Sequence, residues 1–183
     1  MKIIQPLVRS WEKNTSSIFF LAKLYSRFFR RVVEKEIELA EITEKDTILN
    51  IGCGAVPFTA YYLALLSGAK VWAVDCDDEA IEKASFFLQH LNGAASRVKL
   101  VREEGSSFVP ENFTAAVVAL QAEPKEEIFH HLIKTAPSGG RLVFRQAKER
   151  FKSHYDALPQ GVKPLAYVQQ NKQTFDLSLL FVK

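Results

Sequence analysis

Short apolar runs alternate with longer amphipathic segments through most of the chain. The short runs are rich in Val, Ile, Leu and Ala and predict buried strands at 47–51, 70–74, 98–101, 115–120, 141–144, 164–168 and 175–182. The longer segments repeat apolar residues at helical spacing and predict helices at 57–67, 77–91, 124–135 and 148–158. Strands that alternate with helices form parallel sheets covered on both faces, whereas the last two runs predict an antiparallel hairpin at the sheet edge. We therefore expect an α/β, doubly wound, seven-stranded and mostly parallel sheet.

The N-terminal segment has a different pattern. Apolar residues recur at helical spacing between Ile18 and Val33, with basic residues between them. We expect residues 1–45 to form a helical cap and residues 46–183 to form the α/β domain. Residues 1–35 hold eight Lys/Arg and two Glu, whereas the rest of the chain holds sixteen Lys/Arg and nineteen Asp/Glu. The net charge of +3 therefore describes a basic cap on a slightly acidic body, which favours a small or partly anionic partner.

The overall composition excludes several classes of protein. With 48% hydrophobic and 25% charged residues, the chain has the composition of a soluble globular domain. Its two cysteines cannot form a disulfide framework or a zinc site, and no metal centre is expected. No apolar run approaches the ~20 residues of a membrane span, and the N-terminus does not resemble a signal peptide. We expect a cytoplasmic protein that binds neither membrane nor DNA.

A glycine turn follows the first predicted strand. Gly52 allows a tight turn, and Gly54 lets the backbone approach a ligand closely, although such turns also serve packing alone. Asp75 ends the second predicted strand about twenty residues further on, where an acid can bind both hydroxyls of a ribose. Asp75 could instead cap the next helix, but the segment Cys76-Asp77-Asp78 offers better candidates for that role. Pro57 replaces the third glycine of a dinucleotide site, so the turn suits a nucleoside without a pyrophosphate.

This order of elements and motifs resembles the class I S-adenosylmethionine (SAM)-dependent methyltransferases over residues 46–183. The resemblance implies SAM as the cofactor and Asp75 as the ribose-binding acid, with Glu103 or Glu104 near the adenine. Asn50 departs from the family pattern, which has an acid two residues before the first glycine. The residues expected to contact SAM are Gly52, Cys53, Gly54, Asp75, Cys76, Glu104 and Leu120. The two cysteines are expected to pack beside the adenosine rather than react.

Further residues resemble the nicotianamine synthase family. The segment from Gly52 to Ala60 is similar to that family's G-x-G-P-L-P-L-T turn, with Ala55 and Val56 in place of Pro and Leu. The segment 118–125 and the fifth strand, which ends at Arg145, also resemble the family. This resemblance implies transfer of an aminocarboxypropyl group from SAM to an amine of a small molecule. It identifies Glu36 with the family's active-site glutamate, which would remove the proton of the attacking amine.

Several candidate residues keep two interpretations. Glu36 lies in an acidic run that could be a solvated helix face. Either Tyr61 or Tyr62 could place its hydroxyl over the sulfonium, with Tyr62 the candidate catalytic residue, or both could be core residues. Glu123 follows the fourth strand and is a candidate substrate contact. Arg145 could bind a substrate carboxylate, or it could form a surface salt bridge.

Three functions are consistent with the sequence. The first is aminocarboxypropyl transfer to an amine-bearing, possibly anionic, small molecule. The second is methyl transfer to a small molecule. The third is a non-catalytic SAM- or RNA-binding module, which the basic N-terminal segment suggests. The N-terminal helices are also a candidate homodimer contact.

Overall fold

The computed structural model describes residues 29–91, 93–172 and 174–183. Residues 29–39 are helical and precede the sheet. The strands are β1 (Thr47–Ile51), β2 (Lys70–Asp75), β3 (Val98–Arg102), β4 (Ala115–Val118), β5 (Arg141–Ala147), β6 (Ala166–Gln169) and β7 (Phe175–Val182). The helices are α3 (Phe58–Ser67), α4 (Asp78–Gln89) and α5 (Lys125–Thr135), with 3-10 helices η1 (Ala94–Arg97) and η2 (Glu149–His154). The predicted helical cap and homodimer contact therefore lie largely outside the described residues, because residues 1–28 are not among them.

Seven strands form one sheet in the order β3-β2-β1-β4-β5-β7-β6. Strands β1 to β5 pair in parallel, and β7 pairs antiparallel with both β5 and β6. The strand order reverses between β1 and β4, at the point where such sheets bind ligands beyond the strands' carboxyl ends. The predicted fold class and the predicted terminal hairpin are both confirmed.

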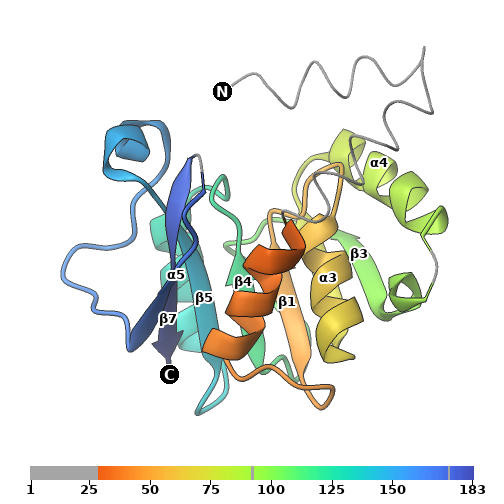
Figure 1. Cartoon of the computed structure of the whole chain (residues 1–183), viewed down its shortest axis with the longest axis horizontal. Coiled ribbons are helices and arrows are strands. Elements are labelled where there is room, and N and C mark those ends of the chain that lie inside the picture. The colour runs from red at the N-terminus through yellow and green to blue at the C-terminus, as the bar shows by residue number, and fades with distance from the viewer. Residues whose placement is uncertain (1–28, 92, 173) are drawn as a thin grey trace.

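Helices cover both faces of the sheet (Figure 1). One face packs on α3, α4 and the helix of residues 29–39, and its core includes Val33, Ile48 and Val143. The opposite face packs on α5, and its core includes Leu49 and Phe144. The alternation follows from strand geometry, because successive side chains of a strand point to opposite faces. The helix of residues 29–39 therefore shares the core of the α/β domain.

Several predicted elements differ from the structure, and the fifth strand extends to Ala147 instead of ending at residue 144. The fourth strand ends at Val118 instead of residue 120. The helix predicted at 148–158 is wrong, because only the 3-10 helix η2 forms there. None of the η2 residues is fully buried, although Phe151 packs partly buried against a small core cluster, so little burial supports a longer helix. Pro159, Gly161 and Pro164 disfavour a helix in the rest of the connection.

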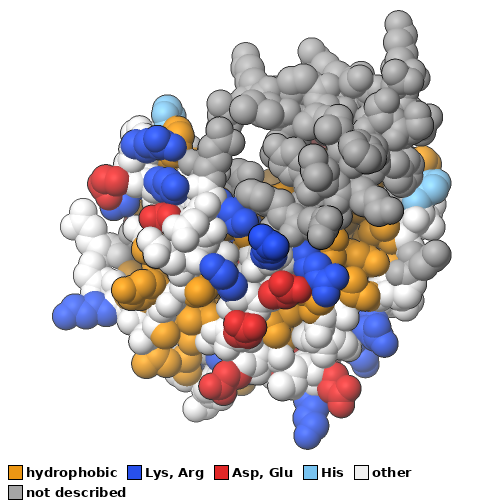
Figure 2. All heavy atoms as spheres, in the orientation of Figure 1, with side chains coloured by type: hydrophobic (Ala, Val, Ile, Leu, Met, Phe, Trp, Pro, Cys, Tyr) orange, Lys and Arg blue, Asp and Glu red, His pale blue; other side chains and the backbone are white. Residues whose placement is uncertain are grey.

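Basic side chains gather on the face formed by the helix of residues 29–39 and the turn after β6 (Figure 2). The Lys35 ammonium donates to the carbonyl of Gln169 at 2.7 Å and so links this helix to β6. Burial, together with the nearby charges of Lys35 and Arg31, lowers the pKa of Lys172. Within the described part of the chain, no helix is both long and apolar enough to cross a membrane.

Candidate functional site

The glycine turn after β1 is fastened to the end of β2. The backbone N–H groups of Gly52 and Cys53 both donate to the carbonyl of Val74, at 2.9 and 3.0 Å. Gly52 and Gly54 both have positive φ, +75° and +66°, a conformation that favours glycine. A Cβ on Gly52 would lie 3.1 Å from the Cβ of Ala119, whereas a Cβ on Gly54 would meet no atom of the described residues within 4 Å. Gly52 thus serves close packing, and Gly54 borders open space.

Asp75 lies beside this turn at the carboxyl end of β2. Its Oδ2 accepts a hydrogen bond from the Gly54 N–H at 2.8 Å, and its Oδ1 accepts from the Asp77 N–H at 3.2 Å. Asp77, not Asp75, caps α4, because its side chain accepts from the Glu79 N–H at 2.9 Å. A carboxylate has about four acceptor positions, so the half-exposed Asp75 retains capacity for a ligand hydroxyl.

Cys53, Cys76 and Glu104 lie around Asp75. Burial, followed by the Asp75 charge, raises the pKa of the Cys53 thiol to about 12. Burial, followed by the charges of Glu104 and Asp75, raises the pKa of the Cys76 thiol. Both thiols are therefore neutral near pH 7, which disfavours a nucleophilic role. The described residues contain no group of three or more potential ligands that could hold a metal ion.

These features fit the adenosine part of SAM. The space beside Gly54 is open, the Asp75 carboxylate can accept from a ribose, and the neighbouring thiols are small and uncharged. Asn50 is buried below the turn and donates to the carbonyl of Val117 at 3.0 Å. Its Oδ1 is buried and has no hydrogen-bond partner among the described residues.

A second cluster centres on Glu36 and Arg145. The Arg145 guanidinium binds the Glu36 carboxylate through two hydrogen bonds, Nε to Oε1 and Nη2 to Oε2, both 2.8 Å. The Ser178 hydroxyl also donates to Glu36 Oε1, at 2.7 Å. Glu36 is completely buried, and Arg145 is 5% exposed. The solvated-face interpretation of Glu36 and the surface interpretation of the Arg145 salt bridge are therefore both wrong.

Two further side chains complete this network. Thr59, at the start of α3, accepts from Arg145 Nη2 at 3.1 Å. Gln170 donates through Nε2 to the Ser178 hydroxyl at 3.0 Å and to the Val32 carbonyl at 3.3 Å. The network thus joins the helix of residues 29–39 to α3, β5 and β7. Thr59 was signalled by its place in the glycine-turn motif, whereas nothing in the sequence pattern marked Ser178 or Gln170.

The remaining predicted residues have different environments. Tyr62 is buried and packs against the rings of Phe58 and Tyr61, with centroids 6.4 and 5.4 Å away. Leu120 is buried, and its carbonyl accepts from the Lys125 ammonium at 2.7 Å. Glu123 is exposed. Their predicted roles, and those of Glu36 and Arg145, stay predictions. Nothing in the sequence pattern marked Lys125 as a functional residue.

The chain resembles known transferases in sequence and in structure, although no family model matches it. It is 26% identical to L-histidine 2-aminobutanoyltransferase of Yersinia pestis over 121 residues, which are 66% of this chain and 45% of that protein. The aligned part thus spans less than half of that relative.

Solved structures resemble all or most of the chain. A mutant of the nicotianamine synthase MtNAS in complex with S-adenosylmethionine matches with a TM-score of 0.80 and 18% identity, over 100% of this chain and 72% of that one. An RNA methyltransferase from Salinibacter ruber in complex with S-adenosyl-L-homocysteine matches with a TM-score of 0.65 and 17% identity. The match covers 83% of this chain and 90% of that one. At these identities the likeness establishes a shared fold.

Proposed function

We propose that this protein is a SAM-dependent transferase that transfers an aminocarboxypropyl group to an amine of a small molecule. The observation that carries the proposal is the sequence likeness to L-histidine 2-aminobutanoyltransferase. The four-carbon amino acid unit in that name has the same carbon skeleton as the aminocarboxypropyl arm of SAM. The likeness in fold to MtNAS supports the same assignment.

The residues around the glycine turn would hold SAM. Gly54 leaves room for the ligand, Asp75 would accept hydrogen bonds from the ribose, and Glu104 would lie near the adenine. Cys53, Cys76, Gly52 and Leu120 would complete the contact surface. When bound, SAM supplies a sulfonium whose Cγ carbon is electrophilic.

The transfer itself needs alignment and removal of one proton. The lone pair of the acceptor nitrogen forms the new C–N bond, the bond from Cγ to sulfur breaks, and its electron pair stays on sulfur. The products are methylthioadenosine and an amine that has one proton to lose. Glu36 is the proposed proton acceptor. Three of about four acceptor positions on its carboxylate are used by Arg145 and Ser178, which leaves one on Oε2.

Arg145 and Ser178 would then fix the orientation of Glu36 rather than meet the substrate directly. An acceptor carboxylate at Arg145 would compete with Glu36 for the guanidinium. Tyr62, on α3, would place its hydroxyl over the sulfonium. Glu123, which is exposed after β4, would contact the substrate.

The reaction product tests the proposal. The full-length protein is incubated with SAM and a panel of small amines, and the remaining nucleoside is identified by mass spectrometry. Methylthioadenosine, formed together with an acceptor that carries the four-carbon unit, is the expected result. S-adenosylhomocysteine would instead show methyl transfer and overturn the proposed group. SAM binding without turnover over the whole panel would favour a non-catalytic module, and failure to bind SAM would refute the cofactor assignment.

A further inference from the structure

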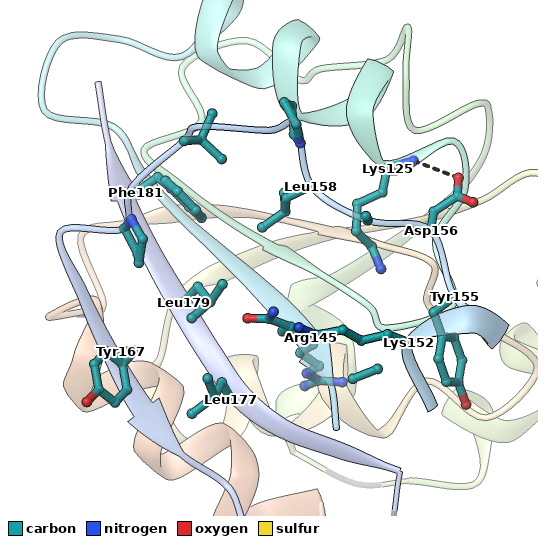
Figure 3. Close-up of a pocket in the computed structure, with 16 residues that line it drawn as sticks. Lys125, Arg145, Lys152, Tyr155, Asp156, Leu158, Tyr167, Leu177, Leu179 and Phe181 are labelled. Carbon is teal, nitrogen blue, oxygen red and sulfur yellow. Dashed lines mark hydrogen bonds between the residues drawn. The ribbon is translucent and has the colours of Figure 1, made fainter. Parts of the chain in front are cut away.

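A cavity of about 450 Å³ lies on the face of the sheet that packs on α5, near the β7–β6 edge (Figure 3). Its floor is apolar and comes from Leu177, Leu179 and Phe181 of β7. Its outer wall is the connection between β5 and β6, including Leu158 and Val162. This volume is in the usual range for small-molecule sites.

The cavity exists because the connection between β5 and β6 contains no α-helix. The connection has only η2, and the residues after it, up to the start of β6, run without regular structure. Strands β5 and β6 run in the same direction, because both pair antiparallel with β7, and in a doubly wound fold a helix between two such strands would cover the sheet. The apolar side chains of β7 on this face are therefore left with room above them.

One end of the cavity holds a buried positive charge. Lys125, the first residue of α5, is 2% exposed, and its side chain reaches into the cavity (Figure 3). Its ammonium has three donors, and the carbonyl of Leu120, at 2.7 Å, is the one acceptor found for it among the described residues. Burial lowers the pKa of Lys125 to about 8, so the ammonium is mostly charged at pH 7.

No charged side chain described near the Lys125 ammonium accepts a hydrogen bond from it. Arg145 is paired with Glu36, and Lys152 is paired with Glu149 at 2.5 Å. Asp156 accepts from the backbone N–H of Lys125 at 3.2 Å, and Figure 3 shows this bond at the opposite end of the residue from the ammonium. Asp156 and Glu123 act on the ammonium electrostatically, but both are exposed. A buried charge is normally paired within hydrogen-bond distance.

We propose that this cavity is a binding site for a small monocarboxylate with an apolar body. The carboxylate accepts from the Lys125 ammonium, and the apolar body lies on Leu177, Leu179 and Phe181. A single unpaired ammonium at an apolar floor matches one negative charge rather than the two of a phosphate. The proposal concerns a site away from the glycine turn and does not depend on the proposed transferase activity.

A pair of probes of nearly equal shape tests the site on the full-length protein without SAM. The probes are 3-phenylpropionate and 3-phenylpropan-1-ol, and their affinities are measured by ligand-observed NMR titration at pH 7. We expect the carboxylate to bind at least tenfold more tightly than the alcohol. This comparison uses the unaltered protein, so it does not depend on the folding of any variant.

Three substitutions then locate the binding. Lys125→Met is expected to weaken 3-phenylpropionate at least tenfold and to leave the alcohol within threefold. Lys152→Met is the matched control, because Lys152 lines the same cavity but is paired with Glu149, and it should change neither probe by more than threefold. Ala157→Trp places a large side chain at the exposed wall and should weaken both probes.

Other outcomes would overturn the proposal. Equal affinity for the two probes would mean that the ammonium does not select a carboxylate. Carboxylate binding that survives both Lys125→Met and Ala157→Trp would mean that the probe binds elsewhere, and absence of binding to the unaltered protein would refute the site. Circular dichroism and thermal midpoints identify any variant that is not folded.

Discussion

At the scale of single residues, Asp75 has two contacts that a substitution can separate. Its carboxylate stabilises the turn through the Gly54 N–H, and its charge is available to a ligand. In Asp75→Asn the amide oxygen can still accept from the Gly54 N–H, but the charge and an acceptor position are lost. Because hydrogen bonds to a charged group are worth about 1.5–3 kcal/mol, we expect SAM affinity to fall by about tenfold or more. Isothermal titration calorimetry with SAM measures this change.

Asp78→Asn provides a matched control for that measurement. Asp78 lies three residues away, is 81% exposed and pairs with Arg102 at the surface. This substitution should leave SAM affinity within twofold, because exposed ion pairs contribute little and none of the proposed cofactor contacts changes. Equal affinities for the Asp75→Asn variant and the unaltered protein would refute the ribose-binding role of Asp75.

The Glu36 carboxylate can be a proton acceptor, a structural anchor, or both. Glu36→Gln keeps the size of the side chain but removes its basicity, so we expect turnover to fall by about 10²–10⁴-fold. SAM affinity should stay within threefold, because none of the proposed cofactor contacts involves Glu36. Single-turnover rates with SAM and an identified acceptor, measured beside SAM titrations, check this result.

The stability of the Glu36→Gln variant needs its own control. The substitution leaves the buried Arg145 guanidinium without an anion, and breaking a buried pair costs about 3–5 kcal/mol. The double variant Glu36→Gln/Arg145→Met removes the unpaired charge and is expected to recover part of that loss in urea unfolding. A Glu36→Gln variant that is destabilised but turns over at the normal rate would assign Glu36 a purely structural role.

At the scale of elements, the two glycines of the turn after β1 have different roles: Gly52 allows close packing, and Gly54 leaves room for a ligand. Gly52→Ala would bring a Cβ to 3.1 Å from Ala119 in a left-handed conformation, so it should lower the free energy of unfolding by more than the ~1–2 kcal/mol of backbone strain alone. Gly54→Ala carries the same kind of strain without a steric contact, so its loss of stability should be smaller. Because its Cβ enters the open space, SAM affinity should fall at least tenfold. Urea unfolding and SAM titration distinguish the two variants, and normal SAM binding by Gly54→Ala would contradict the assigned site.

The helices and strands could largely be predicted from the sequence, because burial of one face makes apolar residues recur at helical or strand spacing. The alternation of strands and helices, the turn at Gly52 and the presence of a helix cap within residues 76–78 all depend on local pattern. The predicted helix at 148–158 failed although Phe151 and Tyr155 pack, partly buried, against a small core cluster, because none of the η2 residues is fully buried. Local spacing cannot reveal how much core surface a segment will find, and the cavity beside β7 was therefore not predicted.

At the scale of the whole molecule, the contacts that join distant segments were beyond the sequence pattern. Glu36 and Arg145 are 109 residues apart, and Ser178 is a further 33 residues along the chain from Arg145. The resemblance to the nicotianamine synthase family marked Glu36 as a base, whereas Arg145 was marked separately, as a side chain that could bind a substrate carboxylate. Only the packing of the N-terminal helix on β5 and β7 brings them together, and that packing depends on the register of an antiparallel pair.

Lys125 gives the whole molecule a distinctive dependence of stability on pH. Its pKa is about 8 in the folded protein, because burial disfavours the charged form, and 10.5 is the ordinary value. Below pH 8 both the folded and unfolded chains hold this proton. Between pH 8 and 10.5 the unfolded chain binds more protons than the folded one, so the contribution of Lys125 to stability rises with pH.

Comparison with Lys125→Met isolates this contribution, because the variant keeps every other titratable group. The free energies of unfolding of the two proteins are measured in urea at pH 7 and pH 9.5. We expect the unaltered protein to gain roughly 2 kcal/mol relative to the variant over this interval, since each pH unit above 8 contributes about 1.36 kcal/mol. A difference that stays constant would mean that the Lys125 ammonium is solvated. A solvated ammonium would not select a carboxylate in the cavity, because that selection depends on burial of the charge.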